Sequence, residues 1–264
     1  MNDTVLVEIA DHVATVTLNR PKALNSLDGD MVEGLVGAML RLERDDAVRC
    51  VVLKGAGDHF MAGGDIKMFA GMTKLDAEAR RSAFRDAFFP KLHPGLLAMR
   101  RMPKPIVASV RGACAGFGVS LAMACDLTLA AESAYFTLAY VRIGACPDGS
   151  STFFLPRLVG LKRAMEIALL GDQFDARTAA GWGVINRAVA DADLDAETAA
   201  LAGRLAAGPR HALANAKALL YASADNPLEK QLEMEAAAFG DCAATPDWLE
   251  GVAAFCEKRP ASFG

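Results

Sequence analysis

The first part of the chain places short apolar runs before a helical pattern. Residues 5–9 and 13–18 are rich in β-branched side chains and flank Asp11-His12, which predicts a β-hairpin. Apolar residues then recur at helical spacing over residues 31–42, and Asp28 is the predicted N-cap of that helix. The pattern therefore predicts that the chain begins with two strands followed by a helix.

The middle of the chain continues this alternation. Further strands are predicted at residues 50–53, 106–110 and 126–131. The segment 75–99 is helical by composition, and we expect interruptions near Pro90 and Pro94 because proline removes a helical hydrogen bond. Strands that alternate with helices indicate βαβ units and a largely parallel sheet.

After about residue 161 the pattern becomes helical and rich in alanine. The predicted helices cover residues 161–170, 194–207, 209–222, 227–239 and 246–256. We therefore predict an α/β core over residues 1–190 and a helical C-terminal region over residues 191–264. Alanine-rich helices of this kind favour packing and an oligomer surface over a cofactor site.

Composition narrows the class of protein. The 264-residue chain is 53% hydrophobic, which argues against disorder, and its net charge of −4 gives no whole-chain reason to expect a nucleic-acid partner. The six cysteines are scattered without a C-x-x-C pair, which indicates reduced thiols, and the four histidines show no metal-ligand spacing. Residues 1–10 lack the features of a secretory signal, and no segment reaches about 18 uninterrupted apolar residues. We therefore expect a cytoplasmic protein with neither a metal site nor a membrane partner.

Two segments place small residues between a strand and a helix. They are Phe60–Lys67, which contains Gly63 and Gly64, and Gly112–Ala122, which contains Gly116. Small residues let a ligand approach the main chain, and N–H groups at the start of a helix are free to donate. Two such groups that converge on one oxygen would form an oxyanion hole. Either segment taken alone is better explained as a tight structural turn.

Together with other motifs, these segments resemble the crotonase superfamily, also called the enoyl-CoA hydratase/isomerase family. The matching motifs, in chain order, are Asn19–Asn25, Ala62–Lys67, Gly112–Asp126, Leu155–Gly160, Ala179–Ile185 and Glu250–Arg259. They cover essentially the whole chain in the right order. The resemblance implies an α/β fold of repeated ββα units, with a helical C-terminal region that builds a homotrimer or a dimer of trimers.

The resemblance also implies a ligand, an acyl-coenzyme A thioester, with coenzyme A as part of the substrate and no separate cofactor. The oxyanion donors would be the N–H groups of Gly64 and Phe117. Family members usually have Gly or Ala at the second position, but a backbone donor tolerates a change of side chain. The substrate-contacting positions that carry over are Ala62, Asp65, Ile66 and Gly116, and the coenzyme A phosphate and adenine positions hold Lys22, Lys67 and Lys258.

The two glutamates that activate water in typical hydratases are replaced in this chain. The resemblance places them at Ser120 and Tyr140, which are then expected to contact substrate. Neither a hydroxyl nor a phenol titrates near neutrality without help, so neither replaces a carboxylate base. Hydration by the two-glutamate route is therefore not expected.

One carboxylate, Asp148, stands in a Pro-Asp-Gly loop before a helix. The resemblance here is closest to enoyl-CoA isomerases and epoxyphenylacetyl-CoA isomerases that use a single catalytic aspartate. One such base can remove a proton from C2 of a 3-enoyl thioester and return it at C4. The alternative is that Asp148 is only the N-cap of the following helix, a position that aspartate favours.

Two further functions stay open at this stage. His93 falls where hydrolytic dehalogenases of the superfamily place a histidine, and Tyr140 falls on their substrate-contacting aromatic residue. In that alternative, Asp148 is a nucleophile and His93 activates water. The second alternative is a scaffold that binds acyl-CoA or RNA with little catalysis; the retained turns, the Asp148 loop and the acidic composition argue against it.

Overall fold

A computed structural model describes residues 3–264, and its strands form two sheets. The larger sheet has the order β1-β2-β3-β4-β6-β9, and the smaller has the order β5-β7-β8. Strands β1 and β2 form the predicted antiparallel hairpin, and every other neighbouring pair of the larger sheet is parallel. The strands are β1 (Val5–Ala10), β2 (Val13–Leu18), β3 (Cys50–Gly55), β4 (Ile106–Val110), β5 (Ala113–Ala115), β6 (Leu127–Ala131), β7 (Tyr135–Thr137), β8 (Phe174–Asp175) and β9 (Arg187–Val189).

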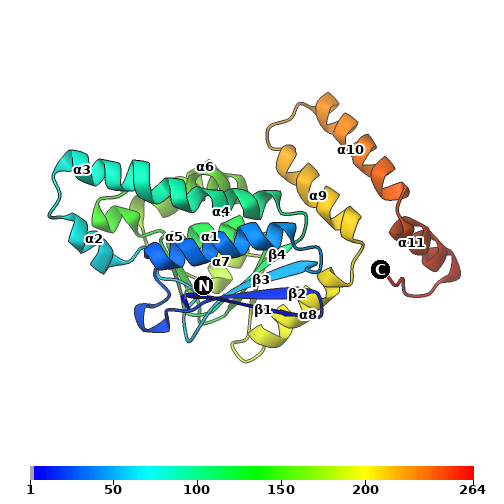
Figure 1. The fold of residues 1–264 in the computed structure, drawn as a ribbon, viewed down its shortest axis with the longest axis horizontal. Helices are drawn as coiled ribbons and strands as arrows, with labels where there is room; N and C mark the ends of the chain where they lie inside the picture. The colour runs from blue at the N-terminus through cyan, green and yellow to red at the C-terminus, as the bar shows by residue number, and fades with distance from the viewer. Residues whose placement is uncertain (1–2) are drawn as a thin grey trace.

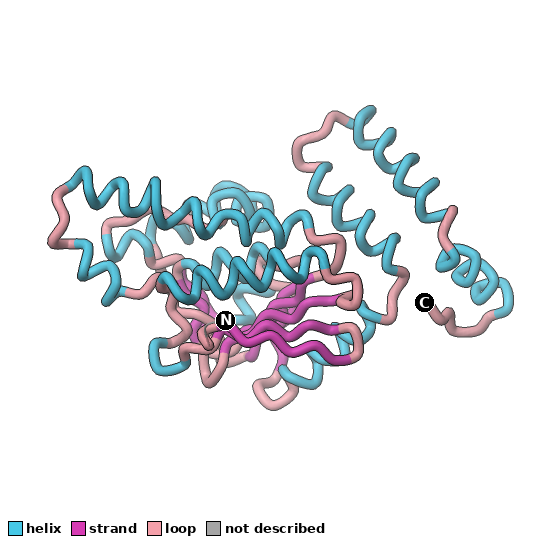
Figure 2. Tube along the Cα trace, viewed as in Figure 1, coloured by secondary structure: helices cyan, strands magenta, loops and turns pink. Residues whose placement is uncertain are grey.

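Helices cover both faces of the larger sheet, with α1 and α4 on one side and α8 on the other (Figures 1 and 2). The α-helices are α1 (Gly29–Arg44), α2 (Ile66–Met72), α3 (Ala77–Ser82), α4 (Phe89–Arg101), α5 (Phe117–Ala124), α6 (Ser151–Leu170), α7 (Ala176–Trp182), α8 (Leu194–Ala206), α9 (Arg210–Ala222), α10 (Leu228–Ala243) and α11 (Pro246–Glu257). The remaining helical turns are the 3₁₀ helices η1 (Pro21–Ala23) and η3 (Tyr140–Ile143) and the π-helical η2 (Ala83–Phe88).

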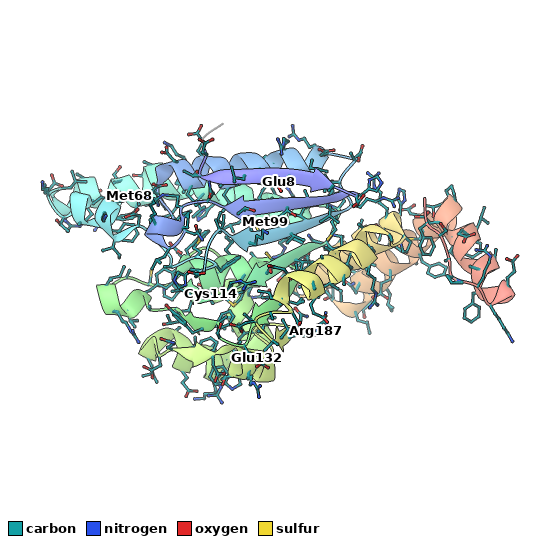
Figure 3. All side chains as sticks on the ribbon, turned by 90° about the horizontal axis from the view of Figure 1, so that it is seen from below. Glu8, Met68, Met99, Cys114, Glu132 and Arg187 are labelled. Carbon is teal, nitrogen blue, oxygen red and sulfur yellow. The ribbon has the colours of Figure 1, made fainter. Side chains whose placement is uncertain are left out.

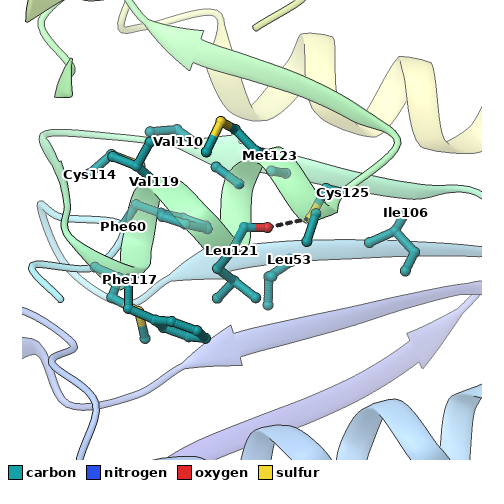
Figure 4. Packing of buried hydrophobic residues seen from close by; sticks show 14 of the residues in the cluster. Leu53, Phe60, Ile106, Val110, Cys114, Phe117, Val119, Leu121, Met123 and Cys125 are labelled. Atoms are coloured by element: carbon teal, nitrogen blue, oxygen red, sulfur yellow. Dashed lines mark hydrogen bonds between the residues drawn. The ribbon is translucent and has the colours of Figure 1, made fainter. Parts of the chain in front are cut away.

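Alternation of side chains along β3 explains the two helical layers. Val51 and Leu53 belong to the core shared with α1 and α4, whereas Cys50 and Val52 belong to the core shared with α8. Successive residues of a strand point to opposite faces, so a short run that is apolar throughout can fill both cores. Figure 3 shows Met99 inside the fold, and Figure 4 shows the side chains of α5 packed against the buried ends of β3 and β4.

Successive ββα units bring the candidate site together. In each unit a long strand is followed by a short second strand and then by a helix: β4, β5 and α5, and likewise β6, β7 and α6. The unit that starts with β3 has only the bridge residue Met61 as its second strand. Met61 pairs in parallel with β5, and β5 pairs in parallel with β7. The segments that leave these short strands therefore emerge at one edge, side by side.

The C-terminal helices divide into one that packs on the sheet and three that extend from it. Helix α8 lies against β3, β4 and β6, so the core of the fold continues past the predicted boundary at residue 190. Helix α9 is attached to the core by Lys217, whose ammonium donates to the partly buried Asp126 carboxylate at 2.8 Å. Tyr221 donates to the same carboxylate at 3.0 Å. Helices α10 and α11 continue outward from α9 (Figure 1).

Most of the predicted elements are present, and Asp28 accepts a hydrogen bond from the Met31 amide as the predicted N-cap. The expected interruption near Pro90 is a π-helical turn, η2, after which Pro90 occupies the first turn of α4, where its missing N–H is tolerated. The second proline, Pro94, lies inside α4 without ending it. Within residues 3–264, no helix is long and apolar enough to cross a membrane.

Candidate active site

The loop that follows Met61 is held in place by two backbone hydrogen bonds with Leu27. The Leu27 amide donates to the Gly63 carbonyl at 2.7 Å, and the Asp65 amide donates to the Leu27 carbonyl at 3.0 Å. Ala62, which is partly buried, starts this loop. Among the described residues, the Gly64 N–H donates to no internal acceptor, so it is available to a ligand.

The turn that follows β5 presents a second free N–H group. Gly116 has φ 50° and ψ −120°, a conformation that favours glycine, and its own amide donates to the Thr137 carbonyl at 2.8 Å. Phe117 is the first residue of α5. Its N–H finds no acceptor in the part of the chain that the structure describes, as is usual for the first turn of a helix.

These two turns lie against each other at Gly63. A Cβ atom built on Gly63 would stand 3.5 Å from both the Phe117 nitrogen and the Gly116 Cα, and 3.1 Å from the Ala115 carbonyl oxygen. The free N–H groups of Gly64 and Phe117 therefore belong to adjoining turns. This is the arrangement that an oxyanion hole requires, because both donors must reach one ligand oxygen.

Asp148 lies in the loop between η3 and α6, and its carboxylate does not cap the helix. The N-cap of α6 is Ser150, which makes no side-chain capping hydrogen bond. The Asp148 Oδ1 instead accepts a hydrogen bond from the Tyr140 hydroxyl at 2.6 Å. Burial raises the pKa of Asp148, and the Tyr140 hydroxyl and the charge of His93 oppose that rise only in part. Asp148 is therefore a desolvated carboxylate, and the N-cap alternative is not the geometry found.

Ser120 and Tyr140 contact Asp148 from two further elements. The Ser120 Oγ is buried, donates to the Asp148 carbonyl at 2.8 Å and lies 3.4 Å from the Tyr140 hydroxyl oxygen. Burial and then the negative charge of Asp148 raise the pKa of Tyr140, so its phenol stays protonated. The two positions expected to contact substrate are thus occupied by neutral hydroxyls that hold the Asp148 segment.

The side chain of Phe117 joins the Gly116–Phe117 turn to the Asp148 loop. A Cβ atom built on Gly149 would stand 2.5 Å from the Phe117 ring, so the ring packs directly against the Gly149 backbone. Phe117 itself is buried (Figure 4). The phenylalanine at this position, where family members usually have Gly or Ala, therefore adds a packing contact with Gly149, the neighbour of Asp148, which the sequence did not reveal.

His93 lies on α4, close enough for its charge to lower the pKa of Asp148. Its ring is exposed and stacks on Phe89, with the ring centroids 5.7 Å apart. Among the described residues, His93 makes no hydrogen bond to Asp148. The structure thus brings His93 near the predicted base without placing it in contact.

A row of aromatic rings runs from Gly64 to His93, and no pattern in the sequence predicted it. The Phe69 ring covers Gly64, since a Cβ atom built on Gly64 would stand 2.4 Å from that ring. The row continues from Phe69 to Phe84 at 5.5 Å, from Phe84 to Phe89 at 6.1 Å, and then to His93. Phe84 lies in the π-helical turn η2, a feature that is frequent at functional sites.

Asp65, which was expected to contact substrate, has partners within the chain for both carboxylate oxygens, and its contact with substrate stays a prediction. Its Oδ1 caps α2 by accepting from the Lys67 amide at 2.9 Å, and its Oδ2 accepts from the Arg20 guanidinium at 2.9 Å. Burial opposes ionisation, but the Arg20 and amide hydrogen bonds outweigh it and lower the pKa of Asp65. Arg20 also donates to the Ser26 carbonyl, so it fixes the segment that supports the Gly64 loop. The neighbouring Ile66 side chain is 58% exposed.

The three predicted coenzyme A lysines are all exposed. Lys22 lies on η1, and Lys67 lies on α2, the helix that follows the Gly64 loop. Lys258 is the C-cap of α11, which lies at the opposite end of the molecule from α2 (Figure 1). Across residues 3–264, no ion pair involves these three ammonium groups, and no group of three or more His, Cys, Asp or Glu side chains could hold a metal ion.

Comparison with known proteins gives matches along the whole chain. The enoyl-CoA hydratase/isomerase family model matches residues 8–264. A probable enoyl-CoA hydratase of Rhodobacter capsulatus is 38% identical over 98% of this chain and 97% of its own length. The 1,2-epoxyphenylacetyl-CoA isomerase of Escherichia coli is 35% identical over 100% of this chain and 99% of its own length. The crystal structure of a Mycobacterium abscessus protein described as an enoyl-CoA hydratase/isomerase superposes with a TM-score of 0.93 at 35% identity, covering 98% of this chain and 99% of that one.

Proposed function

Because the chain belongs to the enoyl-CoA hydratase/isomerase family, whose crotonase-type fold it shares, we propose that it is an isomerase acting on an enoyl-CoA thioester. The reaction would shift a double bond or open a ring epoxide. The observation that carries this proposal is the single desolvated carboxylate, Asp148, beside the two turns with free N–H groups. Hydroxyls at Ser120 and Tyr140 stand where a hydratase has its glutamates.

In the double-bond shift, one proton moves and no other reactant is needed. The Asp148 carboxylate removes a proton from C2 of a 3-enoyl thioester, and the C2–H electron pair becomes part of an enolate. The negative charge on the thioester oxygen is held by the N–H groups of Gly64 and Phe117. The carboxylic acid then returns its proton at C4, the double bond forms between C2 and C3, and Asp148 is a carboxylate again. A pKa raised by burial suits both steps, because the carboxyl must take the proton and release it.

The coenzyme A part of the substrate is expected to lie along η1 and α2. Lys22 and Lys67 are exposed there and carry charges that attract phosphates. Lys258 is too far away within one chain, so its predicted contact with coenzyme A would need α11 of another copy.

Hydration of a 2-enoyl-CoA is expected to be very slow compared with isomerisation of a 3-enoyl-CoA. The reason is that general acid–base groups each contribute about 10²- to 10⁴-fold, and both hydratase glutamates are absent. The measurement is a panel of 2-enoyl-, 3-enoyl- and aromatic acyl-CoA thioesters followed for isomerisation, hydration and halide release. Rapid conversion of crotonyl-CoA to its 3-hydroxy product would contradict the proposed site.

A nucleophilic role for Asp148 is the second candidate, because His93 acts electrostatically on its carboxylate. In that reaction Asp148 would attack a halogenated aromatic ring and displace halide, and water would then hydrolyse the aryl ester and restore the carboxylate. Mass spectrometry of quenched turnover would detect an adduct of Asp148, whereas proton transfer leaves none. Halide release together with this adduct would favour the nucleophilic function over isomerisation.

We also expect the protein to assemble as a homotrimer or a dimer of trimers through its C-terminal helices. Large apolar side chains are exposed there, including Leu249 at 64% and Phe255 at 85%, and an exposed patch of this kind marks an interface. Light scattering at micromolar concentration should give three or six times the subunit mass. The pair Leu249→Asp and Phe255→Asp should reduce that mass, whereas Ile9→Asp, an exposed site on β1, should not. A monomeric wild-type protein would contradict the prediction.

A further inference from the structure

The two oxygens of the Asp148 carboxylate have different surroundings. Oδ1 accepts the hydrogen bond from Tyr140 at 2.6 Å, the short distance expected of a bond to an ionised acceptor. Oδ2 accepts no hydrogen bond from residues 3–264. Oδ2 is therefore the oxygen that is fully open to a ligand, whereas one lone pair of Oδ1 is already engaged.

The Asp148 backbone is fixed independently of its carboxylate. The Asp148 carbonyl accepts from the Ser120 hydroxyl at 2.8 Å, from the Ser151 hydroxyl at 2.8 Å and from the Ser151 amide at 3.1 Å. The Phe117 ring presses on Gly149, which has φ +60°. The remaining freedom of Asp148 is rotation of its side chain, and the Tyr140 hydroxyl is the one described group that restrains it by a hydrogen bond.

Tyr140 also borders the oxyanion turn. A Cβ atom built on Gly116 would stand 4.0 Å from the Tyr140 Cζ, the carbon that bears the hydroxyl. Tyr140 starts η3 directly after Ala139, which has a left-handed conformation at φ 46°. The phenol thus lies between the Gly116–Phe117 turn and the base.

We propose that Tyr140 is a positioning residue for Asp148: its hydroxyl holds Oδ1 and turns Oδ2 toward the substrate as the oxygen that carries the proton. This inference rests on the proposed isomerase function. The position that holds a water-activating glutamate in hydratases would here hold a neutral donor that orients the single base. A misplacement of about 1 Å can cost on the order of 10²-fold in rate, so such a restraint has a measurable effect.

The expected pH effect has a definite sign. The titratable groups that act on the Asp148 carboxylate are Tyr140, from η3, and His93, from α4, and both favour its ionised form. Removing the Tyr140 hydroxyl should therefore raise the pKa of Asp148. Because the base works when ionised, the acidic limb of the kcat/KM profile should move to higher pH.

The experiment compares Tyr140→Phe with Tyr135→Phe, which removes the same hydroxyl from a tyrosine on β7. Two quantities are followed against pH: kcat/KM for a 3-enoyl-CoA, and the infrared carboxyl band that disappears in Asp148→Asn. Tyr140→Phe should shift both midpoints to higher pH and lower kcat on the plateau by roughly 10- to 10²-fold, with KM little changed. Tyr135→Phe should leave both midpoints at their wild-type values.

The two readouts separate this inference from the proposed function. If the wild-type protein does not isomerise the thioester, the proposed function fails, and the infrared titration still tests whether Tyr140 holds the carboxylate. An unchanged infrared midpoint in a Tyr140→Phe protein with wild-type circular dichroism would overturn the positioning role. So would a Tyr140→Phe enzyme with a wild-type pH profile and plateau.

Discussion

Asp148→Asn should lower kcat for isomerisation of a 3-enoyl-CoA by about 10²- to 10⁴-fold, the usual contribution of a general base. The amide has nearly the same shape as the carboxylate and can still accept the hydrogen bond that Tyr140 gives to Oδ1. It cannot take up the proton from C2. The loss should therefore fall on kcat, with binding of the coenzyme A part little changed.

A matched control is Asp76→Asn, which makes the same chemical change at an exposed residue that caps α3. Asparagine and aspartate cap helices about equally well, so this variant should keep both stability and activity. Asp148→Asn should also keep its thermal stability, because the Asp148 carboxylate caps no helix. Turnover that persists undiminished in Asp148→Asn would remove Asp148 from the reaction.

The fraction of product that keeps the proton taken from C2 is an independent test of the same step. Burial shields the Asp148 carboxyl, so a proton taken from C2 should return in part to C4 before it exchanges with water. Wild-type turnover in deuterated water should therefore incorporate less than one deuterium per product. The acidic limb of kcat/KM should lie above the pH at which an exposed carboxylate titrates, since burial raises the pKa of Asp148.

The layered fold follows from patterns that act over a few residues. The β-branched runs at residues 5–9 and 13–18, and the cap at Asp28, are local features, and all three are found in the structure, the first run as the strand Val5–Ala10. The three-residue strands β5 and β7 were missed because such short segments show no clear periodicity. Each follows a long strand of the larger sheet, β5 after β4 and β7 after β6, and those two long strands are themselves paired.

In the site, too, residues that belong to local motifs could be predicted, whereas contacts between separate segments could not. The motifs located Gly64, Phe117 and Asp148, and their backbones lie where two adjoining turns and one loop meet. The hydrogen bond from Tyr140 and the guanidinium contact from Arg20 to Asp65 could not be predicted, because each joins residues whose proximity depends on the packing of separate units. The N-cap alternative for Asp148 failed for a related reason: the partner of its carboxylate comes from another element.

The other large effect is expected from Gly63→Ala, which should lower kcat by about 10²- to 10³-fold, the usual cost of losing one oxyanion donor. Gly63 has φ +92°, and a new Cβ atom would stand 3.1 Å from the Ala115 carbonyl and 3.5 Å from the Phe117 nitrogen. To relieve these contacts the Gly64 loop must move away from the Phe117 turn. The two N–H groups could then no longer reach one thioester oxygen together.

The control for this change is Gly71→Ala on α2, where a new Cβ atom would meet nothing within 4 Å. Alanine is favoured over glycine inside a helix by roughly 0.5–1 kcal/mol, so Gly71→Ala should retain activity and unfold no more easily than wild type. Backbone strain should lower the free energy of unfolding of Gly63→Ala by about 1–3 kcal/mol. Because a folded domain typically has a free energy of unfolding of about 5–15 kcal/mol, this variant should still fold. A Gly63→Ala enzyme with wild-type kcat would rule out the paired N–H groups as the oxyanion site. So would a liganded structure whose thioester oxygen lies more than about 3.5 Å from both nitrogens, because that distance is beyond hydrogen-bond range.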